Sequence, residues 1–200
     1  MSQSNNVNEK LVDNTTAIQT ADTNIVTAIG DSYKTDGVTN SKVVITHEHH
    51  EIHEGQTFLI SGQTTLGLGA TYSILLTTPD TNKHCHLVGH VRATGEANVA
   101  LYENPTGAVA GAAITAYNKN RNSADTNTTT ANVLTSVTTP GTLLETQYFG
   151  SGQNVGGEGR ATEEWVLKKN EEYILRVTST SAGNDISFVL AWYEHTDLLA

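Results

Sequence analysis

Residues 160–197 read RATEEWVLKKNEEYILRVTSTSAGNDISFVLAWYEHTD, and this stretch decides the fold class. Apolar and polar residues alternate along two segments of it, 173–177 and 186–192. Alternation with a period of two is typical of β-strands that bury one face and expose the other. The residues expected to face the core are Tyr173, Leu175, Val177, Ile186, Phe188, Leu190 and Trp192. Small and polar residues at 181–185 favour a turn, so the stretch predicts an antiparallel strand pair.

Further short segments with strand character run through the chain before this pair. They are residues 42–47, 57–60, 71–78, 84–94, 97–103, 112–118, 133–137, 143–149 and 164–167. Residues 118–130 hold no apolar side chain larger than alanine and predict a long exposed loop, while the glycine-rich residues 150–159 predict a flexible one. About ten short strands separated by turns predict an all-β fold, an antiparallel β-sandwich that is jelly-roll-like.

Residues 1–40 lack this alternation, so we predict an N-terminal arm at 1–40 and a β-sandwich domain at 41–200. Two series of residues spaced seven apart run through the arm, and all of their members except Asn14 are apolar, which favours a short helical segment that bundles between subunits, most simply as a trimer. The residues expected at that interface are Val7, Leu11, Ile18, Ala21, Ile25 and Ala28. The alternative is a polar extended arm that orders against a partner, because the threonines and asparagines of this segment are poor helix formers. Both alternatives make the arm a device for anchoring or trimerisation.

The charge and composition limit the partners that we expect. The formal net charge is −10 and the basic residues are scattered, whereas nucleic-acid binding needs a basic patch, so we expect no nucleic-acid partner. No apolar run is long enough to span a bilayer and no signal peptide is visible, so we expect no membrane partner and synthesis in a cytoplasm. Cys85 is the single cysteine, which excludes an intrachain disulfide, and we expect it to be a small buried residue.

Two clusters of histidine are the main candidates for chemistry. They comprise His47, His49, His50 and His53 in the first cluster and His84, His86 and His90 in the second. Residues two apart on a strand share a face, so His47 with His49, and His84 with His86, would each present a pair of imidazoles that suits a metal such as zinc. Three glutamates interleave with the first cluster, which instead favours ion pairs at a subunit interface. We favour the interface for the whole first cluster, and predict no metal and no cofactor.

Motifs of familiar enzyme classes are missing from the sequence. There is no nucleophile elbow, no phosphate-binding loop, no zinc-protease helix and no calcium loop. The glutamate doublets at 163–164 and 171–172 are carboxylate pairs, but neighbours on a strand point to opposite faces, so each doublet predicts a solvated edge. The sequence therefore predicts no catalytic residues and a protein that is not an enzyme; the alternative is an enzyme that acts on polysaccharide, which would need paired carboxylates in one cleft.

Several segments resemble a group of tailed-bacteriophage virion proteins in their amino-acid sequence. These segments are 160–197, HHEIHEG at 49–55, AYNKNRNS at 116–123 and GTLL at 141–144, and the resemblance covers about residues 43–197. It implies a capsid decoration (cement) protein or a head-fibre protein on the outer capsid surface, made in the bacterial host cytoplasm. It also implies the major capsid protein as partner and a homotrimer as the assembled form. The acidic charge fits an outer surface away from packaged DNA.

A binding module of the tail-fibre or adhesin type, which recognises a host-surface glycan, is the alternative. The loops at 104–111, 118–131 and 150–160 would form its site. Tyr117 and Tyr148 flank the polar loop and are the aromatic residues best placed to stack on a sugar, although we favour packing beneath the loop for both.

Overall fold

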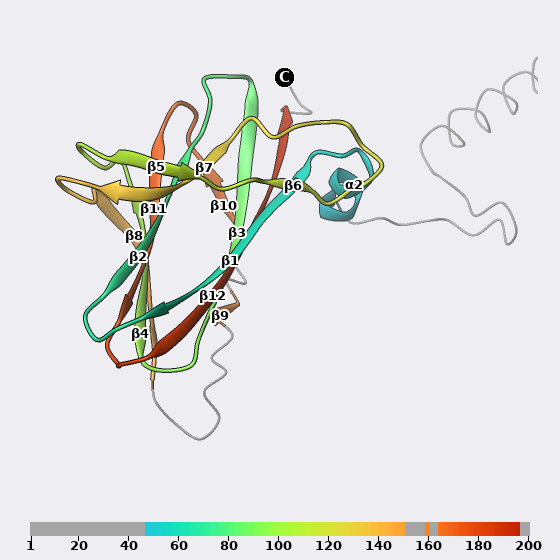
Figure 1. Cartoon of the computed structure of the whole chain (residues 1–200). Coiled ribbons are helices and arrows are strands. Elements are labelled where there is room, and N and C mark those ends of the chain that lie inside the picture. Colours follow the sequence, from blue (N-terminus) through green and yellow to red (C-terminus); the bar gives the residue numbers. More distant parts are fainter. Residues whose placement is uncertain (1–46, 151–158, 161–163, 197–200) are drawn as a thin grey trace, which may run out of the picture. The chain divides into compact units, whose positions relative to one another are not determined.

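The computed structural model describes residues 47–150, 159–160 and 164–196, which form one helix and twelve strands (Figure 1). The helix is α2 (His47–His53), and the strands are β1 (Thr57–Leu66), β2 (Thr71–Thr77), β3 (Lys83–Ala93), β4 (Ala97–Glu103), β5 (Val109–Ala113), β6 (Tyr117–Asn118), β7 (Thr130–Ser136), β8 (Thr142–Phe149), β9 (Gly159–Arg160), β10 (Trp165–Leu167), β11 (Glu172–Ser179) and β12 (Asn184–Thr196). The predicted arm at 1–40, with its interface residues, lies outside the described residues and stays a prediction.

The strands form two antiparallel sheets that pack face to face, on the right and left of Figure 1. The first sheet has the order β10-β3-β12-β1-β6, with β9 also paired to β3, and the second has the order β5-β7-β2-β11-β4-β8. The predicted all-β fold, an antiparallel β-sandwich, is confirmed. Neighbours in each sheet are often distant in sequence, which is why the strand order was not readable from the sequence.

The core lies between the sheets, and it includes six of the seven residues predicted to face it, while the seventh, Leu175, is partly buried against it. Phe58, Tyr173, Phe188 and Trp192 are all buried there, and the Phe58 and Trp192 rings lie 6.3 Å apart. Burying a large apolar side chain of this kind stabilises the fold by about 1.5–3 kcal/mol. Cys85 is also buried in this core as a free thiol, as predicted.

Strand β12 is the central strand of the first sheet and the longest strand described. It pairs with β1 from Thr57↔Tyr193 to Leu66↔Asn184, and with β3 from Ile186↔Ala93 to Thr196↔Lys83. The strand extends beyond the predicted 186–192 at both ends, and the alternation of burial stops at Trp192, because Tyr193 and Glu194 are buried as well. This extension brings residues 193–196 beside the start of β3, where two of the predicted histidines lie.

The prediction of a strand at 42–47 is wrong at His47, which begins helix α2; residues 42–46 lie outside the described part of the chain. Gly55 ends the helix in a left-handed conformation, with φ of +75°. The backbone N–H of Gly55 donates to the carbonyl oxygen of Ile52 at 3.1 Å, and the N–H of Gln56 donates to the carbonyl oxygen of Glu51 at 2.9 Å. This is the bonding pattern of a Schellman cap. Gly55 is therefore the residue in the sequence that marks the end of this helix.

The predicted strand at 112–118 is also wrong as a single unit. Its first part belongs to β5, which pairs with β7 in the second sheet, whereas Tyr117 pairs with Leu59 of β1 in the first sheet. The chain therefore crosses from one sheet to the other between Ala113 and Tyr117. The local sequence does not reveal such a crossing, because the sheet that a strand joins depends on its pairing partner.

Candidate functional site

The buried carboxylate of Glu194, near the end of β12, fixes the loop that joins β6 to β7. It is only 1% exposed, and it accepts hydrogen bonds from the backbone N–H groups of Thr128 and Thr129 at 2.8–3.0 Å. The Thr128 hydroxyl donates to it at 2.6 Å and the Trp192 indole at 3.0 Å. A buried carboxylate needs several donors to offset its lost hydration, and this one has them. The loop that we predicted as exposed is thus anchored to the core at its far end.

The near end of the same loop is held by asparagine side chains of the AYNKNRNS segment. The Asn118 amide donates to the carbonyl oxygens of Gly55 at 2.7 Å and Asp125 at 3.1 Å. The Asn120 amide donates to the carbonyl oxygen of His53, the last residue of α2, at 2.8 Å. These bonds give the segment a structural role: it joins the helix end to the loop, beside β6 in Figure 1.

The first histidine cluster lies on helix α2, so the prediction that His47 and His49 share the face of a strand is wrong. The helix instead pairs residues four apart, and the Nε2 atoms of His49 and His53 lie 2.9 Å from each other. His50 lies 3.5 Å and 3.8 Å from the carboxylates of two neighbouring glutamates, in contacts that are ionic when it is protonated. His49, His50 and His53 are exposed, and their predicted role at a subunit interface stays a prediction.

The second cluster lies on β3 and gains a member from β12. His84 and His86 are two apart on β3, as predicted, and His195 of β12 pairs directly across from His84. The ring centroids of His195 and His86 are 4.6 Å apart, and those of His195 and His84 are 6.4 Å apart. His90 has no ring contact with these histidines within the described residues. Sequence reasoning missed His195 because 109 residues separate it from His86 and only the pairing of β3 with β12 brings the two together.

The side chain of His86 is fixed on two sides by residues of neighbouring strands. Its Nδ1 atom contacts Glu164, just before β10, and the same carboxylate oxygen accepts the Tyr193 hydroxyl at 2.6 Å. The Tyr193 ring stacks on the imidazole, with centroids 4.4 Å apart and an interplanar angle of 15°. Glu164 belongs to a doublet that we predicted as a solvated edge, but it supports this network; Glu163 lies outside the described residues.

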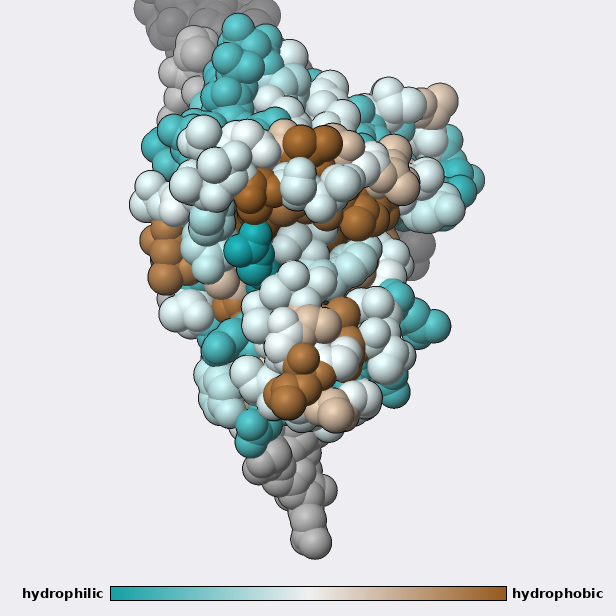
Figure 2. All heavy atoms as spheres, turned by 60° about the vertical axis from the view of Figure 1, so that its left-hand side comes forward, coloured by the Kyte–Doolittle hydropathy of each residue, from teal (hydrophilic) through white to brown (hydrophobic). Residues whose placement is uncertain are grey.

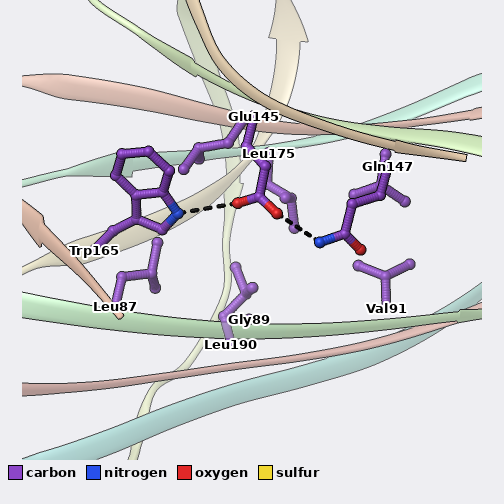
Figure 3. A pocket seen from close by; sticks show the side chains of 10 residues that line it. Leu87, Gly89, Val91, Glu145, Gln147, Trp165, Leu175 and Leu190 are labelled. Atoms are coloured by element: carbon purple, nitrogen blue, oxygen red, sulfur yellow. Dashed lines mark hydrogen bonds between the residues drawn. The ribbon is translucent and has the colours of Figure 1, made fainter. Parts of the chain in front are cut away.

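A small cavity lies between the two sheets, beside edge strands β8 and β10 (Figure 3). Its volume is about 50 Å³, and its walls are mostly apolar. Trp165 donates its indole N–H to Glu145 at 3.0 Å, and the Gln147 amide donates to the same carboxylate at 2.5 Å. A cavity of this size, with the carboxylate and amide groups of Glu145 and Gln147 in its wall, has room for water.

The outer face of the second sheet carries a row of apolar side chains in cross-strand register. The row runs Leu143, Tyr102, Ile174 and Leu75, over strands β8, β4, β11 and β2. Ile174 and Leu75 are 0% and 2% exposed although they point away from the core between the sheets, whereas Leu143 at the edge strand is 51% exposed. Figure 2 shows apolar patches among polar side chains on this side of the molecule. An apolar row that opens at a sheet edge is suited to a protein contact.

The outer face of the first sheet carries a polar hollow instead. Its volume is about 700 Å³, and Gln63, Thr65, Arg92, Asp185 and Ser187 are among the residues that line it. The Thr65 hydroxyl donates to the Asp185 carboxylate at 2.6 Å across strands β1 and β12. Polar hydroxyl, amide and carboxylate groups of this kind suit sugar hydroxyls, but no aromatic residue lines the hollow.

Tyr117 and Tyr148, the aromatic residues considered for sugar stacking, are both exposed, so packing beneath the loop is wrong for them. Tyr117 lies on β6, an edge of the first sheet, and Tyr148 lies on β8, an edge of the second. The cavity at Trp165 and Glu145 places β8 beside β10, at the opposite edge of the sandwich from β6. The two tyrosines therefore do not belong to one sugar site.

The described residues contain no group of three or more histidine, cysteine, aspartate or glutamate side chains arranged to hold a metal ion. In the same residues, no helix is both long and apolar enough to cross a membrane. In comparisons with known proteins, the chain matches no family model and no curated protein.

Proposed function

We propose that this chain is a non-enzymatic structural protein of a tailed-bacteriophage virion, which binds the outer capsid surface as a homotrimer. In this role it is a capsid decoration (cement) or head-fibre protein, and its partner is the major capsid protein. The observation that carries the proposal is the resemblance of residues 43–197 to virion proteins of this group, together with a β-sandwich in the described residues of that same part of the chain. The net charge of −10 favours a surface turned away from packaged DNA.

The apolar row on the outer face of the second sheet supports this role, because it offers an apolar surface for a protein contact. Leu143 is half exposed on edge strand β8, and Tyr148 is 59% exposed on the same strand. Stable protein interfaces bury roughly 1,200–2,000 Å² in total and place apolar and aromatic side chains at their centre. We assign the capsid contact to this edge of the second sheet, with the predicted arm at 1–40 as a second anchor. Burial at this edge would stabilise the assembled shell by mass action.

The test is the number of copies in purified particles, measured by quantitative mass spectrometry against the major capsid protein. A ratio near one copy per capsid subunit supports a decoration protein, and a few copies per hundred support a head fibre. Absence from intact particles overturns the proposal. Light scattering on the purified chain then tests the trimer, and a monomer at all concentrations contradicts that part.

The alternative, a tail-fibre or adhesin-like module that binds a host-surface glycan, is favoured by one observation, the polar hollow on the first sheet. A glycan array probed with the purified chain tests it. Specific binding that is lost in the Arg92→Ala or Asp185→Ala variant supports the alternative, and an array without binding at high protein concentration contradicts it.

A further inference from the structure

His86 and His195 present their Nε2 atoms to each other at a distance of 2.9 Å. The two histidines come from neighbouring strands β3 and β12 of the first sheet and lie on its outer face. Two bare imidazole nitrogens at this distance would repel each other. A stable contact needs either a hydrogen on one of the two nitrogens or a metal ion that both of them bind. The partners of the other ring nitrogens decide which of these holds.

Both Nδ1 atoms face groups that only accept hydrogen bonds. The Nδ1 atom of His86 contacts the Glu164 carboxylate, which also accepts the Tyr193 hydroxyl. The Nδ1 atom of His195 lies 2.8 Å from the carbonyl oxygen of Thr196. Each Nδ1 atom must therefore carry a hydrogen, which leaves both Nε2 atoms as bare lone pairs when the rings are neutral.

We propose that His86 and His195 bind a divalent transition-metal ion between their Nε2 atoms. The arrangement of acceptors supports this, because histidines that bind metals donate their other N–H to a carboxylate or to a backbone carbonyl. Both kinds of acceptor are present here: the Glu164 carboxylate lies at Nδ1 of His86, and the Thr196 carbonyl oxygen lies at Nδ1 of His195. The site is independent of the virion role proposed above, and either proposal can fail alone.

The geometry also favours a class of metal. Imidazole nitrogen binds such metals at about 2.0–2.1 Å, so a nitrogen separation of 2.9 Å corresponds to an angle of about 90° at the ion. That angle belongs to neighbouring ligands in square-planar or octahedral coordination, which Cu²⁺ and Ni²⁺ adopt with nitrogen ligands, and not to tetrahedral Zn²⁺. Since the described residues supply two ligands, water completes the coordination, and His84 is the nearest further imidazole, 6.4 Å from His195 between ring centroids.

The site is held in place before a metal arrives. The His86 side chain is only 14% exposed, and Tyr193 stacks on its ring at 4.4 Å. Tyr193 also stacks on His195, with centroids 5.7 Å apart. Fixed ligands lose little conformational freedom on binding, which favours a site built on strands over one built on a mobile loop.

The pair on helix α2 is the matched control. The Nε2 atoms of His49 and His53 also lie 2.9 Å apart, but within the described residues no acceptor on Nδ1 fixes either tautomer. One ring can then donate its Nε2–H to the other, so this pair needs no cation. Both side chains are exposed, and the helix is short.

The experiment is a titration of the metal-free full-length chain with Cu²⁺ against a competing chelator, with electron paramagnetic resonance of the first equivalent. We expect one tightest site per chain, with coupling to two imidazole nitrogens. The His86→Gln and His195→Gln variants should each weaken that site by about tenfold or more, and Glu164→Gln by about 10–100-fold, because it removes the carboxylate behind His86. The His49→Gln/His53→Gln double variant should leave the site unchanged. Circular dichroism verifies that each variant folds. If His86→Gln does not fold, His195→Gln is the variant to use, because the Nδ1 contact of His195 is exposed.

Three outcomes would overturn the proposal. One is a tightest site that survives in both His86→Gln and His195→Gln. The second is a tightest site that is lost in the His49→Gln/His53→Gln variant. The third is a chain that binds no Cu²⁺ in this region while nitrogen-15 NMR shows one proton shared between the two Nε2 atoms.

Discussion

Trp192 and Glu194, two residues apart on the inner face of β12, are joined by a hydrogen bond of 3.0 Å from the indole N–H to the carboxylate. The same carboxylate accepts the N–H groups of Thr128 and Thr129, so one side chain connects the largest core residue to the loop before β7. The central strand of the first sheet therefore also orders a connection that leads into the second sheet.

Replacing this carboxylate should destabilise the protein more than replacing an exposed one. In the Glu194→Ala variant, donors of Thr128, Thr129 and Trp192 lose a buried acceptor, and hydrogen bonds to charged groups contribute about 1.5–3 kcal/mol each before relaxation. We expect a loss of at least about 3 kcal/mol in the free energy of unfolding by urea denaturation. The control is Asp185→Ala, which removes an exposed carboxylate, and it should cost under about 1 kcal/mol. Equal losses of stability in the two variants would contradict this structural role of Glu194.

Cys85 should make the protein less stable at alkaline pH. Burial raises the pKa of its thiol from 9.0 to about 12. Because the pKa is higher in the folded state, the stabilisation is fully present below pH 9 and is lost as the pH rises from about 9 to 12, where only the unfolded chain releases the proton. The loss is about 1.4 kcal/mol by about pH 10. Burial also raises the pKa of Tyr173, which acts in the same direction.

Urea denaturation of the wild type and of Cys85→Ala at pH 8 and pH 10 measures this effect. The variant should lose less stability between the two values, because it lacks the titrating thiol. The folded wild type should also react slowly with a thiol reagent at pH 8. Rapid reaction, or identical pH dependence in the two proteins, would contradict the buried state of Cys85.

Gly141, which opens the GTLL segment, should not tolerate a side chain. Its φ is +91°, and a Cβ there would lie 2.1 Å from the carbonyl oxygen of Glu103 and 2.6 Å from that of Asn104. Gly183→Ala is the matched control, because Gly183 has φ of +63° with open space around it. The control should cost about 1–2 kcal/mol for the left-handed conformation alone, and Gly141→Ala about 1–3 kcal/mol more. Thermal melting of both variants measures this difference in stability. Similar melting temperatures would show that the Glu103 carbonyl can move aside.

The exposed edge of the second sheet should be needed for the capsid contact that we propose. Leu143→Ser and Tyr148→Ser together remove two half-exposed side chains of β8 and should weaken binding to particles that lack the chain by about tenfold or more. The matched control is Val166→Ser, since Val166 is equally exposed on β10, in the first sheet. Co-sedimentation with such particles is the measurement. If the control loses as much binding as the β8 variant, the contact lies elsewhere.

The sequence predicted the sandwich because β3 and β12 alternate over much of their length, and Cys85, Leu87, Phe188 and Trp192 are buried as that alternation requires. It did not predict the burial of Leu75 and Ile174, which point to the outer face of the second sheet. Local alternation carries no information about what covers the outer face of a sheet. Helix α2 was missed because a run of histidine and glutamate has no apolar period.

The candidate sites were harder to predict for a related reason. The pairing of His86 with His195, and the contact of Glu145 with Trp165, depend on strand order, which antiparallel pairing across long connections sets only in three dimensions. His84 and His86 were found because they are neighbours on one strand. The functional role rests on resemblance and not on any of these contacts.

The position of β12 in the chain has a consequence for synthesis. The ribosome releases β1 and β3 well before residues 184–196, yet those residues pair with both strands along their length. The first sheet therefore has a gap at its centre until β12 has been translated. During that interval β1 and β3 expose unpaired edges, which are templates for association with other chains. The chain should depend on chaperones, or on rapid completion of synthesis, more than a sandwich whose neighbouring strands are made in succession.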